Sequence, residues 1–389
     1  MNDQALNIGV FGARGIPSTY SGFDTFLTTL LPELAARGHD VTMYCRKGQV
    51  TQSSTYRGVT LRHLPAYDSK QLSTLSHGLL SAVTSRWRRH DVVLVVSVAN
   101  APFCRISHLT GQPVVLNTDG QEWLRGKWGG AARRYFYESA RMAKTSAVGL
   151  VTDCQAMRDI YLKEFQAESS VIPYTYAGVD VQPRSDVLNR YGLQPNRFVA
   201  IAGRLNPENN IAEVAESFCR SSVDIPLAVM GVANYDSPVQ SRLEELAGRD
   251  PRLRLLGHVE DRGVFASLIG LAAVYVHAHS VGGINPSLVE AMGSSARVLA
   301  LDTPFNREAL ADAGRYFEDP SSDFGPALEA TLLAEPAGER ERARLRAHTV
   351  FTLKKIADAY EAVLVEASRQ PRTRGLHVPT EWAHEAQRS

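Results

Sequence analysis

One short segment of the chain combines glycines, a helix-capping residue and a carboxylate at a spacing that suits anion and hydroxyl binding. Residues 280–293 read Ser-Val-Gly-Gly-Ile-Asn-Pro-Ser-Leu-Val-Glu-Ala-Met-Gly and follow an apolar run at 273–277 that predicts a strand. Asn285 can cap a helix with Pro286 at its first position, where the missing N–H costs nothing. The free N–H groups of a helix start favour phosphate, and Glu290, about one turn further in, can accept hydrogen bonds from a ligand hydroxyl. A site that binds a diphosphate at the helix start and a ribose at the Glu290 carboxylate would be a nucleotide-sugar pocket.

A glycine-containing loop follows the first expected strand. Residues 12–22 read Gly-Ala-Arg-Gly-Ile-Pro-Ser-Thr-Tyr-Ser-Gly after the strand expected at 6–11. Glycine there, including Gly15, lets the backbone approach a ligand closely, and Arg14 can reach a phosphate. The loop matches neither GxGxxG nor a P-loop, which weakens dehydrogenase and P-loop interpretations. The alternative is an ordinary loop with a surface arginine.

A second loop repeats this logic after the strand expected at 198–202. Residues 203–210 read Gly-Arg-Leu-Asn-Pro-Glu-Asn-Asn. Arg204 at a strand end can grip a diphosphate by two hydrogen bonds. The alternative is that Arg204 pairs with a nearby carboxylate such as Glu208.

Residues 114–128 form the densest polar and aromatic segment. They begin as a strand and place several such side chains on a loop, namely Asp119, Glu122, Trp123, Arg125, Lys127 and Trp128. Carboxylates beside aromatic rings suit a carbohydrate site, because rings cover apolar sugar faces. Asp119 is the first candidate for contacting a reacting sugar or its acceptor. The alternative is a salt-bridged loop anchored by two buried tryptophans.

Residues 76–90 predict a helix with one apolar face and a basic end. Leu80, Val83 and Trp87 share that face, and three arginines, Arg86, Arg88 and Arg89, cluster at the end. A helix that lies in a membrane interface has this pattern. So does a helix packed on a sheet whose cationic end matches its dipole.

No metal site is expected. His277 and His279 flank Ala278, and we expect them to point to opposite sides of an extended chain. The sequence contains no HExxH and no DxD pattern, so a metal-bridged diphosphate has no support. The expected cofactor is therefore none, with a nucleoside-diphosphate sugar as co-substrate.

Length and composition indicate a soluble two-domain protein. The chain has 389 residues, of which 44% are hydrophobic and 21% charged, and this length exceeds that of a usual single core. Four scattered cysteines and the lack of a signal-like start predict a cytoplasmic protein with reduced thiols. Residues 1–180 hold 19 Lys and Arg against 14 Asp and Glu. Such a basic half can face an anionic membrane, although so small a difference also arises by chance.

Strand and helix patterns alternate along both halves, which predicts two doubly wound parallel sheets. Strands are expected at 6–11, 41–44, 59–63, 92–97, 113–117, 147–151 and 170–172, then at 198–202, 226–230, 252–256, 273–277 and 298–301. We expect an N-terminal domain at 1–182, a C-terminal domain at 190–350 and a helix at 352–368 that returns to the first domain. Residues 370–389 are expected to form a flexible tail. Two such domains would face each other across a central cleft.

These elements resemble the retaining nucleotide-sugar glycosyltransferases of the GT-B fold, specifically glycosyltransferase family four. The resemblance rests on Gly22-Phe-Asp, on residues 37–41 (Arg-Gly-His-Asp-Val), on Gly203-Arg-Leu and on the helix start at 285–290. The chain looks closest to a bacterial subgroup often labelled rhamnosyltransferases. That subgroup is suggested by residues 12–17, 117–128, 279–283 and 302–308.

The resemblance implies a role for each matched position. Arg204 would hold the donor diphosphate, Glu290 the ribose, and the turn at 282–287 would offer backbone amides. The residues expected at the donor are Gly15, Arg204, Asn209, Gly282, Gly283, Asn285, Ser287 and Glu290. Those expected at the acceptor are Tyr20, Glu122, Trp123, Arg125 and Trp128, and Asp119 and Arg204 are the expected catalytic residues. Transfer would proceed with retention by same-face attack, since no positioned carboxylate nucleophile is visible.

The chain departs from the wider family at three positions. A glutamate eight residues before Glu290 is replaced by Gly282, a lysine five residues after Arg204 is replaced by Asn209, and Ser21 stands where relatives often have glycine. Fewer polar contacts would suit a 6-deoxyhexose such as L-rhamnose.

Two other functions remain open at this stage. An epimerase or hydrolase on the same architecture would act without an acceptor, and a non-catalytic protein would only bind the nucleotide sugar. The expected partners are the donor and a glycan, lipid-linked or small-molecule acceptor, with no nucleic acid. Peripheral contact with the inner membrane face would fit a lipid-linked acceptor.

Overall fold

The chain divides into two compact units. The computed structural model describes residues 5–18, 22–50, 52–67, 72–126, 128–176, 184–233 and 237–370. The first unit comprises Met1–Leu124, Trp128–Ala177 and the C-terminal stretch from Leu353, and the second comprises Arg125–Lys127 and Gly178–Thr352. The expected residue Tyr20 and most of the expected tail, from 371 onward, lie outside the described residues.

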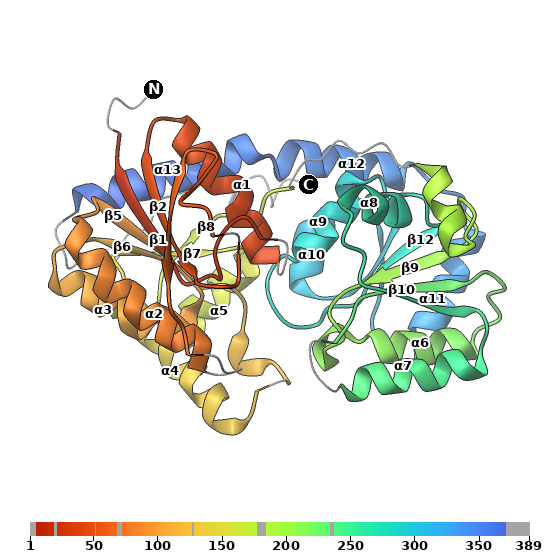
Figure 1. Cartoon of the computed structure of the whole chain (residues 1–389). Helices are drawn as coiled ribbons and strands as arrows, with labels where there is room; N and C mark the ends of the chain where they lie inside the picture. Colours follow the sequence, from red (N-terminus) through yellow and green to blue (C-terminus); the bar gives the residue numbers. More distant parts are fainter. Residues whose placement is uncertain are drawn as a thin grey trace. The chain divides into compact units, whose positions relative to one another are not determined.

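The first unit is built on an eight-stranded sheet in the order β3-β4-β2-β1-β5-β6-β7-β8 (Figure 1). Its strands are β1 (Asn7–Phe11), β2 (Asp40–Arg46), β3 (Thr55–Tyr56), β4 (Val59–Leu64), β5 (Val92–Val96), β6 (Val114–Asn117), β7 (Gly149–Thr152) and β8 (Ser170–Val171). All neighbouring pairs are parallel except β3 with β4. Its helices are α1 (Gly22–Ala36), α2 (Leu72–Ser85), η1 (Arg86–Arg88), η2 (Val98–Asn100), α3 (Ala101–Leu109), η3 (Glu122–Leu124), α4 (Gly130–Ser146), α5 (Gln155–Phe165) and α13 (Leu353–Arg369).

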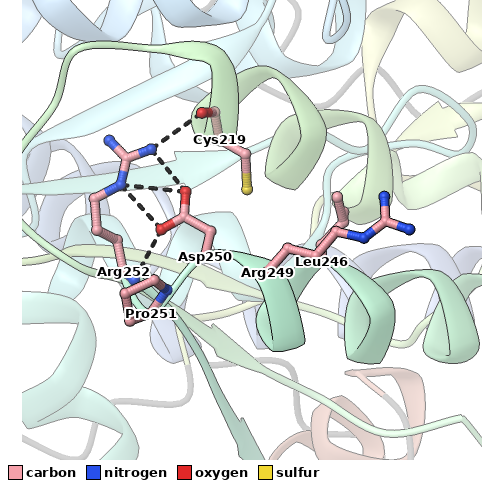
Figure 2. A pocket seen from close by; sticks show the side chains of 6 residues that line it. All are labelled: Cys219, Leu246, Arg249, Asp250, Pro251 and Arg252. Carbon is pink, nitrogen blue, oxygen red and sulfur yellow. Dashed lines mark hydrogen bonds and ion pairs between the residues drawn. The ribbon is translucent and has the colours of Figure 1, made fainter.

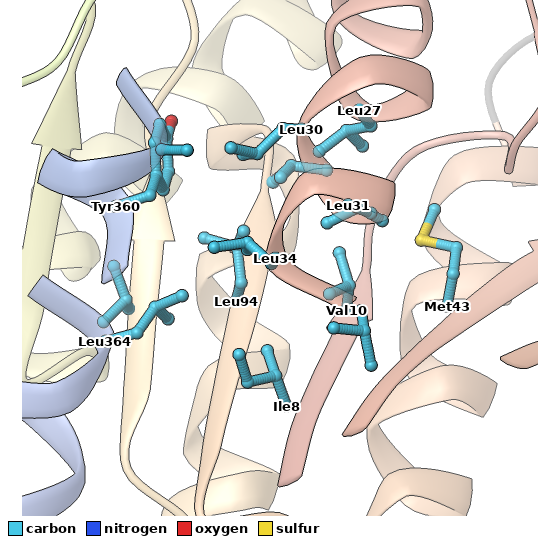
Figure 3. Packing of buried hydrophobic residues seen from close by; sticks show 14 of the residues in the cluster. Ile8, Val10, Leu27, Leu30, Leu31, Leu34, Met43, Leu94, Tyr360 and Leu364 are labelled. Carbon is cyan, nitrogen blue, oxygen red and sulfur yellow. The ribbon is translucent and has the colours of Figure 1, made fainter. Parts of the chain in front are cut away.

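Helix α13 completes the core of the first unit although it lies far from that unit in the sequence. Its residues Ile356, Tyr360, Val363 and Leu364 are fully buried. They recur at helical spacing, so they form one apolar stripe. Figure 3 shows Tyr360 and Leu364 packed with α1 leucines and with apolar residues of the central strands. Removing this helix would therefore uncover the sheet.

The second unit is built on a six-stranded, fully parallel sheet in the order β11-β10-β9-β12-β13-β14. Its strands are β9 (Val199–Ala202), β10 (Leu227–Met230), β11 (Leu253–Gly257), β12 (Val274–His277), β13 (Val298–Leu301) and β14 (Arg315–Phe317). Its helices are η4 (Ser185–Tyr191), η5 (Pro207–Asn209), α6 (Ile211–Arg220), α7 (Pro238–Arg249), α8 (Arg262–Gly270), α9 (Pro286–Gly293), α10 (Pro304–Leu310), α11 (Phe324–Leu333) and α12 (Glu339–Val350). Helices α6, α7 and α11 share one core cluster with the strands, while α8 and α12 contact α9.

This architecture confirms the predicted fold class of two Rossmann-like α/β units with parallel sheets. Each strand expected from the sequence is present with end shifts of a few residues, and the returning helix lies at Leu353–Arg369. The short strands β3 and β14 were not predicted, because two or three residues are too few to show a period.

Helix α2 differs from the expected packing. It buries mainly small residues, including Gly78, Ser81 and Ala82, whereas Leu80 and Val83 are only half-buried. Trp87 was expected on the packed face and is instead 70% exposed. The reason is that the α-helix ends at Ser85 and a tighter 3-10 turn follows, which rotates Trp87 off that face.

Candidate functional site

Two loops meet at the carboxyl edge of the second sheet. They follow β9 and β12, which are neighbours in register, with Val276 opposite Ile201. Ser280 donates from its backbone N–H and from its hydroxyl to the Glu208 carbonyl oxygen, each at 3.0 Å. Asn210 donates through Nδ2 to the Ala278 carbonyl oxygen at 2.7 Å. The arginine loop and the glycine turn, predicted separately, are therefore one structural element.

The helix start expected at Asn285 is present. The Asn285 side chain accepts hydrogen bonds from Ser287 N at 3.0 Å and from the Ser287 hydroxyl at 2.8 Å, and Pro286 opens α9. The preceding Gly282 has a φ of 121°, a conformation that favours glycine. The turn of Gly282 and Gly283 thus leads the backbone into a capped helix whose first N–H groups carry the positive end of the dipole.

Glu290 is held by an arginine that the sequence pattern did not reveal. Arg262 Nη2 lies 2.8 Å from Glu290 Oε1, and about 20% of the Glu290 side chain is exposed. Burial raises the pKa of Glu290, and the Arg262 charge opposes that rise. Arg262 opens α8, whose cap at Asp261 accepts from Gly263 N and Val264 N. The cap fixes the start of that helix, and the ion pair fixes the orientation of the carboxylate.

Arg204 is exposed at the end of β9, and no described residue forms a hydrogen bond or ion pair with its guanidinium. The expected alternative, a pair with Glu208, is therefore wrong, because Glu208 lies 3.6 Å from Arg125 instead. Asn209 is buried and donates through Nδ2 to the Arg204 carbonyl oxygen at 2.7 Å. Asn209 thus shapes the loop that carries Arg204.

The two histidines of this edge lie on the same side of the chain, contrary to the expectation. The rings of His277 and His279 are 4.4 Å apart and inclined by 32°. The expectation is wrong because residues two apart in an extended chain share a face. Burial lowers the pKa of His277 to about 3 and that of His279 well below its usual range, so both rings are neutral at pH 7.

In the first unit, Asp119 lies just beyond the end of β6 in a left-handed conformation, with a φ of 58°. Its N–H donates to Asn117 Oδ1 at 2.9 Å, and its Oδ1 accepts from the Tyr174 hydroxyl at 3.2 Å. Asn117 in turn donates to the Tyr360 hydroxyl of α13 at 2.6 Å. A non-glycine residue persists in such a conformation only where its surroundings hold it.

The other expected residues of the first unit form largely internal contacts. Trp123 is buried against the rings of three aromatic residues, Tyr137, Tyr161 and Phe165. Glu122 is buried as well, and its Oε2 accepts from Trp128 Nε1 at 2.9 Å. For Trp123 this placement matches the alternative of a loop anchored by tryptophan.

The glycine-containing loop of the first unit contacts its own sheet. A Cβ atom at Gly15, where φ is 130°, would lie 2.7 Å from Cys45. Arg14 donates to Gln49 Oε1 at 2.9 Å, and its backbone N–H donates to the buried Asp24 at 3.1 Å. Close packing therefore explains the glycine at this position.

A separate depression of about 440 Å³ lies at the opposite edge of the second sheet, beside the amino end of β11. Figure 2 shows Cys219, Asp250 and Arg252 among its lining residues. Arg252 pairs with Asp250 at 2.7 Å and donates to the Cys219 carbonyl oxygen at 3.1 Å, while burial raises the pKa of the Cys219 thiol to about 11. Arg252 therefore connects Asp250 to the last turn of α6 through hydrogen bonds.

The described residues show neither a cluster of metal ligands nor a membrane-spanning helix. No three or more His, Cys, Asp or Glu side chains among them are grouped as metal ligands would be. No helix in the described ranges has the length and apolar character required to cross a bilayer.

Comparisons with known proteins found a family match over part of the chain and several structures with a similar fold. Residues 21–175 match the model of the family described as Glycosyl transferase 4-like domain, whereas a comparison with curated protein sequences found no match. Sucrose-phosphate synthase from Thermosynechococcus elongatus is 16% identical with a TM-score of 0.77, over 93% of this chain and 98% of that one. Anabaena HepE in complex with UDP-glucose is 14% identical with a TM-score of 0.75, over 93% and 100%.

A third similar structure contains a sugar phosphate. It is an α,α-trehalose-phosphate synthase (UDP-forming) from Burkholderia xenovorans in complex with glucose-6-phosphate, 12% identical with a TM-score of 0.71, over 93% of this chain and 100% of that one. At these identities the structures establish the fold alone, and the family model covers less than half of the chain. The chain therefore has the fold of these structures, with two Rossmann-like units, and its residues 21–175 are similar to a glycosyl transferase 4-like domain.

Proposed function

We propose that this chain transfers a sugar from a nucleoside-diphosphate donor to an acceptor hydroxyl, with retention of the anomeric configuration. The observation that carries the proposal is the joint placement of three groups at the carboxyl edge of the second sheet. They are the exposed Arg204, the capped start of α9 and the oriented carboxylate of Glu290. Parallel sheets bind ligands at this edge. The fold shared with a protein in complex with UDP-glucose supports the same assignment.

The chemistry follows from the charges at this edge. As the bond between the sugar and the diphosphate breaks, negative charge develops on the departing phosphate oxygen. Arg204 and the N–H groups at the start of α9 stabilise that charge where it forms. Since these groups supply the positive charge, we propose that transfer needs no divalent cation, and that turnover is unchanged by addition of a chelator.

Glu290 and Asp119 complete the proposed assignment. Glu290 accepts hydrogen bonds from the ribose hydroxyls, with Arg262 holding its orientation. Asp119 contacts the reacting sugar or the acceptor, which we propose to be a glycan, a glycolipid or a natural product. Gly282 offers no carboxylate to a sugar hydroxyl, and this favours a 6-deoxyhexose such as L-rhamnose as the transferred group.

The test is release of nucleoside diphosphate from UDP-, dTDP- and GDP-sugars, measured with and without candidate acceptors that include glucose 6-phosphate. Arg204→Ala and Glu290→Ala should each lower turnover by about 100-fold or more with an unchanged circular dichroism spectrum. Arg242→Ala is the matched control, because within the described residues Arg242 pairs with Glu216 and Glu245 on the surface.

The same assay separates the competing functions. Free sugar or an isomerised donor without an acceptor would indicate a hydrolase or an epimerase. Tight donor binding without any turnover would indicate a binding protein. Turnover at the wild-type rate in both Arg204→Ala and Glu290→Ala would refute the assignment of these residues to the donor site.

We also propose that the first unit touches an anionic membrane from the cytoplasmic side through α2 and η1. Leu72, Leu79 and Trp87 are 51%, 45% and 70% exposed, and three exposed arginines, Arg86, Arg88 and Arg89, lie beside Trp87 in the sequence. Exposed apolar side chains followed by a cluster of cations are the pattern of an interfacial helix. Flotation with vesicles containing phosphatidylglycerol should recover the wild type and much less of Trp87→Ser. Equal recovery of both would refute this contact.

A further inference from the structure

A buried ion pair at the carboxyl edge of the second sheet has no role in the function proposed above. Arg125 Nη1 lies 3.6 Å from Glu208 Oε1, and the two side chains are only 11% and 3% exposed. Neither carboxylate oxygen of Glu208 has a hydrogen-bond partner among the described residues. A buried carboxylate is costly unless a cation accompanies it. Glu208 therefore holds the Arg125 guanidinium at this edge.

The guanidinium lies beside the two positions at which the chain departs from the family it resembles. A Cβ atom placed on Gly282 would lie 3.6 Å from Arg125 Nη2, so Arg125 adjoins the space that a larger side chain would occupy at this position, where the family resemblance implies a glutamate. Asn209, where relatives carry a lysine, follows Glu208 directly and turns its amide to the Arg204 carbonyl oxygen. The family's cation is thus missing at Asn209, and another cation is present nearby.

Arg204 and Arg125 also act on a common neighbour. Both charges contribute to lowering the pKa of the His279 imidazole, whose ring would be 3.1 Å from a Cβ atom on Gly203. Both positive charges are therefore close enough to this neutral ring to act on it. A doubly charged diphosphate is the ligand that two such guanidinium groups match.

We propose that Arg125 is the second cation for the donor diphosphate, in place of the lysine that relatives have at the position of Asn209, and that Glu208 is the residue that positions it. This inference rests on the proposed function and moves Arg125 from the acceptor to the donor. It also explains Gly282, since a glutamate there would compete with the diphosphate for the guanidinium.

The experiment is calorimetric titration of the full chain with UDP, dTDP and GDP and with the corresponding monophosphates. Arg125→Gln should weaken the binding of the preferred diphosphate about tenfold or more, while the affinity for its monophosphate changes less than about threefold. Arg125→Lys keeps the charge and should retain most of the affinity. Arg242→Gln is the control, with wild-type affinities for both ligands.

Glu208 is tested in the same way. Arg125→Gln leaves a buried carboxylate without its cation, so the double variant Arg125→Gln/Glu208→Gln guards against misfolding and should show the same selective loss. Glu208→Gln alone should weaken the diphosphate less than Arg125→Gln does, because the cation remains but is no longer held.

Each outcome decides between the two proposals. If the wild type binds a diphosphate and the double variant binds it equally well, the inference about Arg125 is wrong and the proposed function stands. An equal loss of affinity for the diphosphate and the monophosphate would also overturn the inference about Arg125. Such a result would show that the effect of Arg125 does not depend on the second phosphate. If the wild type binds none of the three diphosphates, the proposed function fails and this inference fails with it.

Discussion

Replacing Tyr360 by Phe tests whether the returning helix α13 supports the proposed reaction through Asp119. The Tyr360 hydroxyl accepts a hydrogen bond from Asn117 Nδ2 at 2.6 Å, and Asn117 Oδ1 accepts from Asp119 N at 2.9 Å. Tyr360 and Asn117 are both about 1% exposed, so no water replaces the lost hydroxyl. The substitution removes one oxygen atom and leaves the ring packing intact.

The expected effect on stability follows from the unpaired Asn117 amide. A buried donor that loses its partner costs about 1–3 kcal/mol. The Asn117 side chain is then less firmly oriented, which weakens its hydrogen bond to Asp119 N, while the Asp119 carboxylate keeps its hydrogen bond from the Tyr174 hydroxyl at 3.2 Å. If the weaker orientation of Asp119 raises the activation free energy of transfer by about 1.4 kcal/mol, turnover falls about tenfold. Donor affinity should not change, since the proposed donor contacts lie in the second unit.

The assays are urea unfolding and diphosphate release. Tryptophan fluorescence is a suitable probe, because Trp87, Trp123 and Trp128 all belong to the first unit. Tyr316→Phe is the matched control: it removes a hydroxyl that donates to the Ala311 carbonyl oxygen at 2.6 Å in the second unit, so it should lower the stability of that unit, followed by circular dichroism, without lowering turnover. Wild-type turnover in a measurably destabilised Tyr360→Phe would refute the supporting role of this hydrogen-bond chain.

Three further outcomes can be checked by unfolding experiments. Leu364→Ala, at a fully buried site of α13, should destabilise the first unit by about 3–5 kcal/mol, and a cost under about 1 kcal/mol would show that α13 does not complete the core. Asn285→Ala should cost about 1 kcal/mol through loss of the α9 cap, with Asn285→Ser as the variant that restores it. Burial lowers the pKa of His77 and His90 from 6.5 to about 4, so the unfolded chain takes up protons first as the pH falls. Stability should be complete above about pH 6.5 and decrease by up to about 3 kcal/mol per histidine toward pH 4, and a flat profile over that range would contradict the burial of these rings.

The helices and strands of this fold could be predicted from the sequence because each depends on a local pattern of residues. Val92–Val96 is a continuous apolar run, as a strand covered on both faces should be. Helix α13 shows its apolar stripe at helical spacing, and Asn285 with Pro286 predicts the start of α9 from two adjacent residues. Such signals depend only on chain geometry and on the polarity of neighbouring side chains.

The groups that orient the candidate site could not be predicted in this way. Arg262 and Glu290 are 28 positions apart, and Asn117 and Tyr360 are 243 positions apart, so no period connects them. Trp123 illustrates the reverse problem, since an aromatic residue in a polar loop suits sugar binding and core anchoring equally well. Only the positions of Tyr161 and Phe165 decide that its ring is internal.

The positions at which the chain differs from the family it resembles are explained by their three-dimensional neighbours. At Asn209 the chain lacks the lysine that the family resemblance implies, and at Gly282 it lacks the glutamate. Taken separately, each replacement would weaken a donor site. In the structure, the guanidinium of Arg125 lies next to the missing side chain of Gly282 and is anchored by Glu208, the residue before Asn209. If a glutamate were present at Gly282, it would neutralise this guanidinium, so the loss of the anion is a condition for the substitute cation to meet a phosphate. The two departures are then one coupled exchange, and restoring only one of the family residues should not improve donor binding.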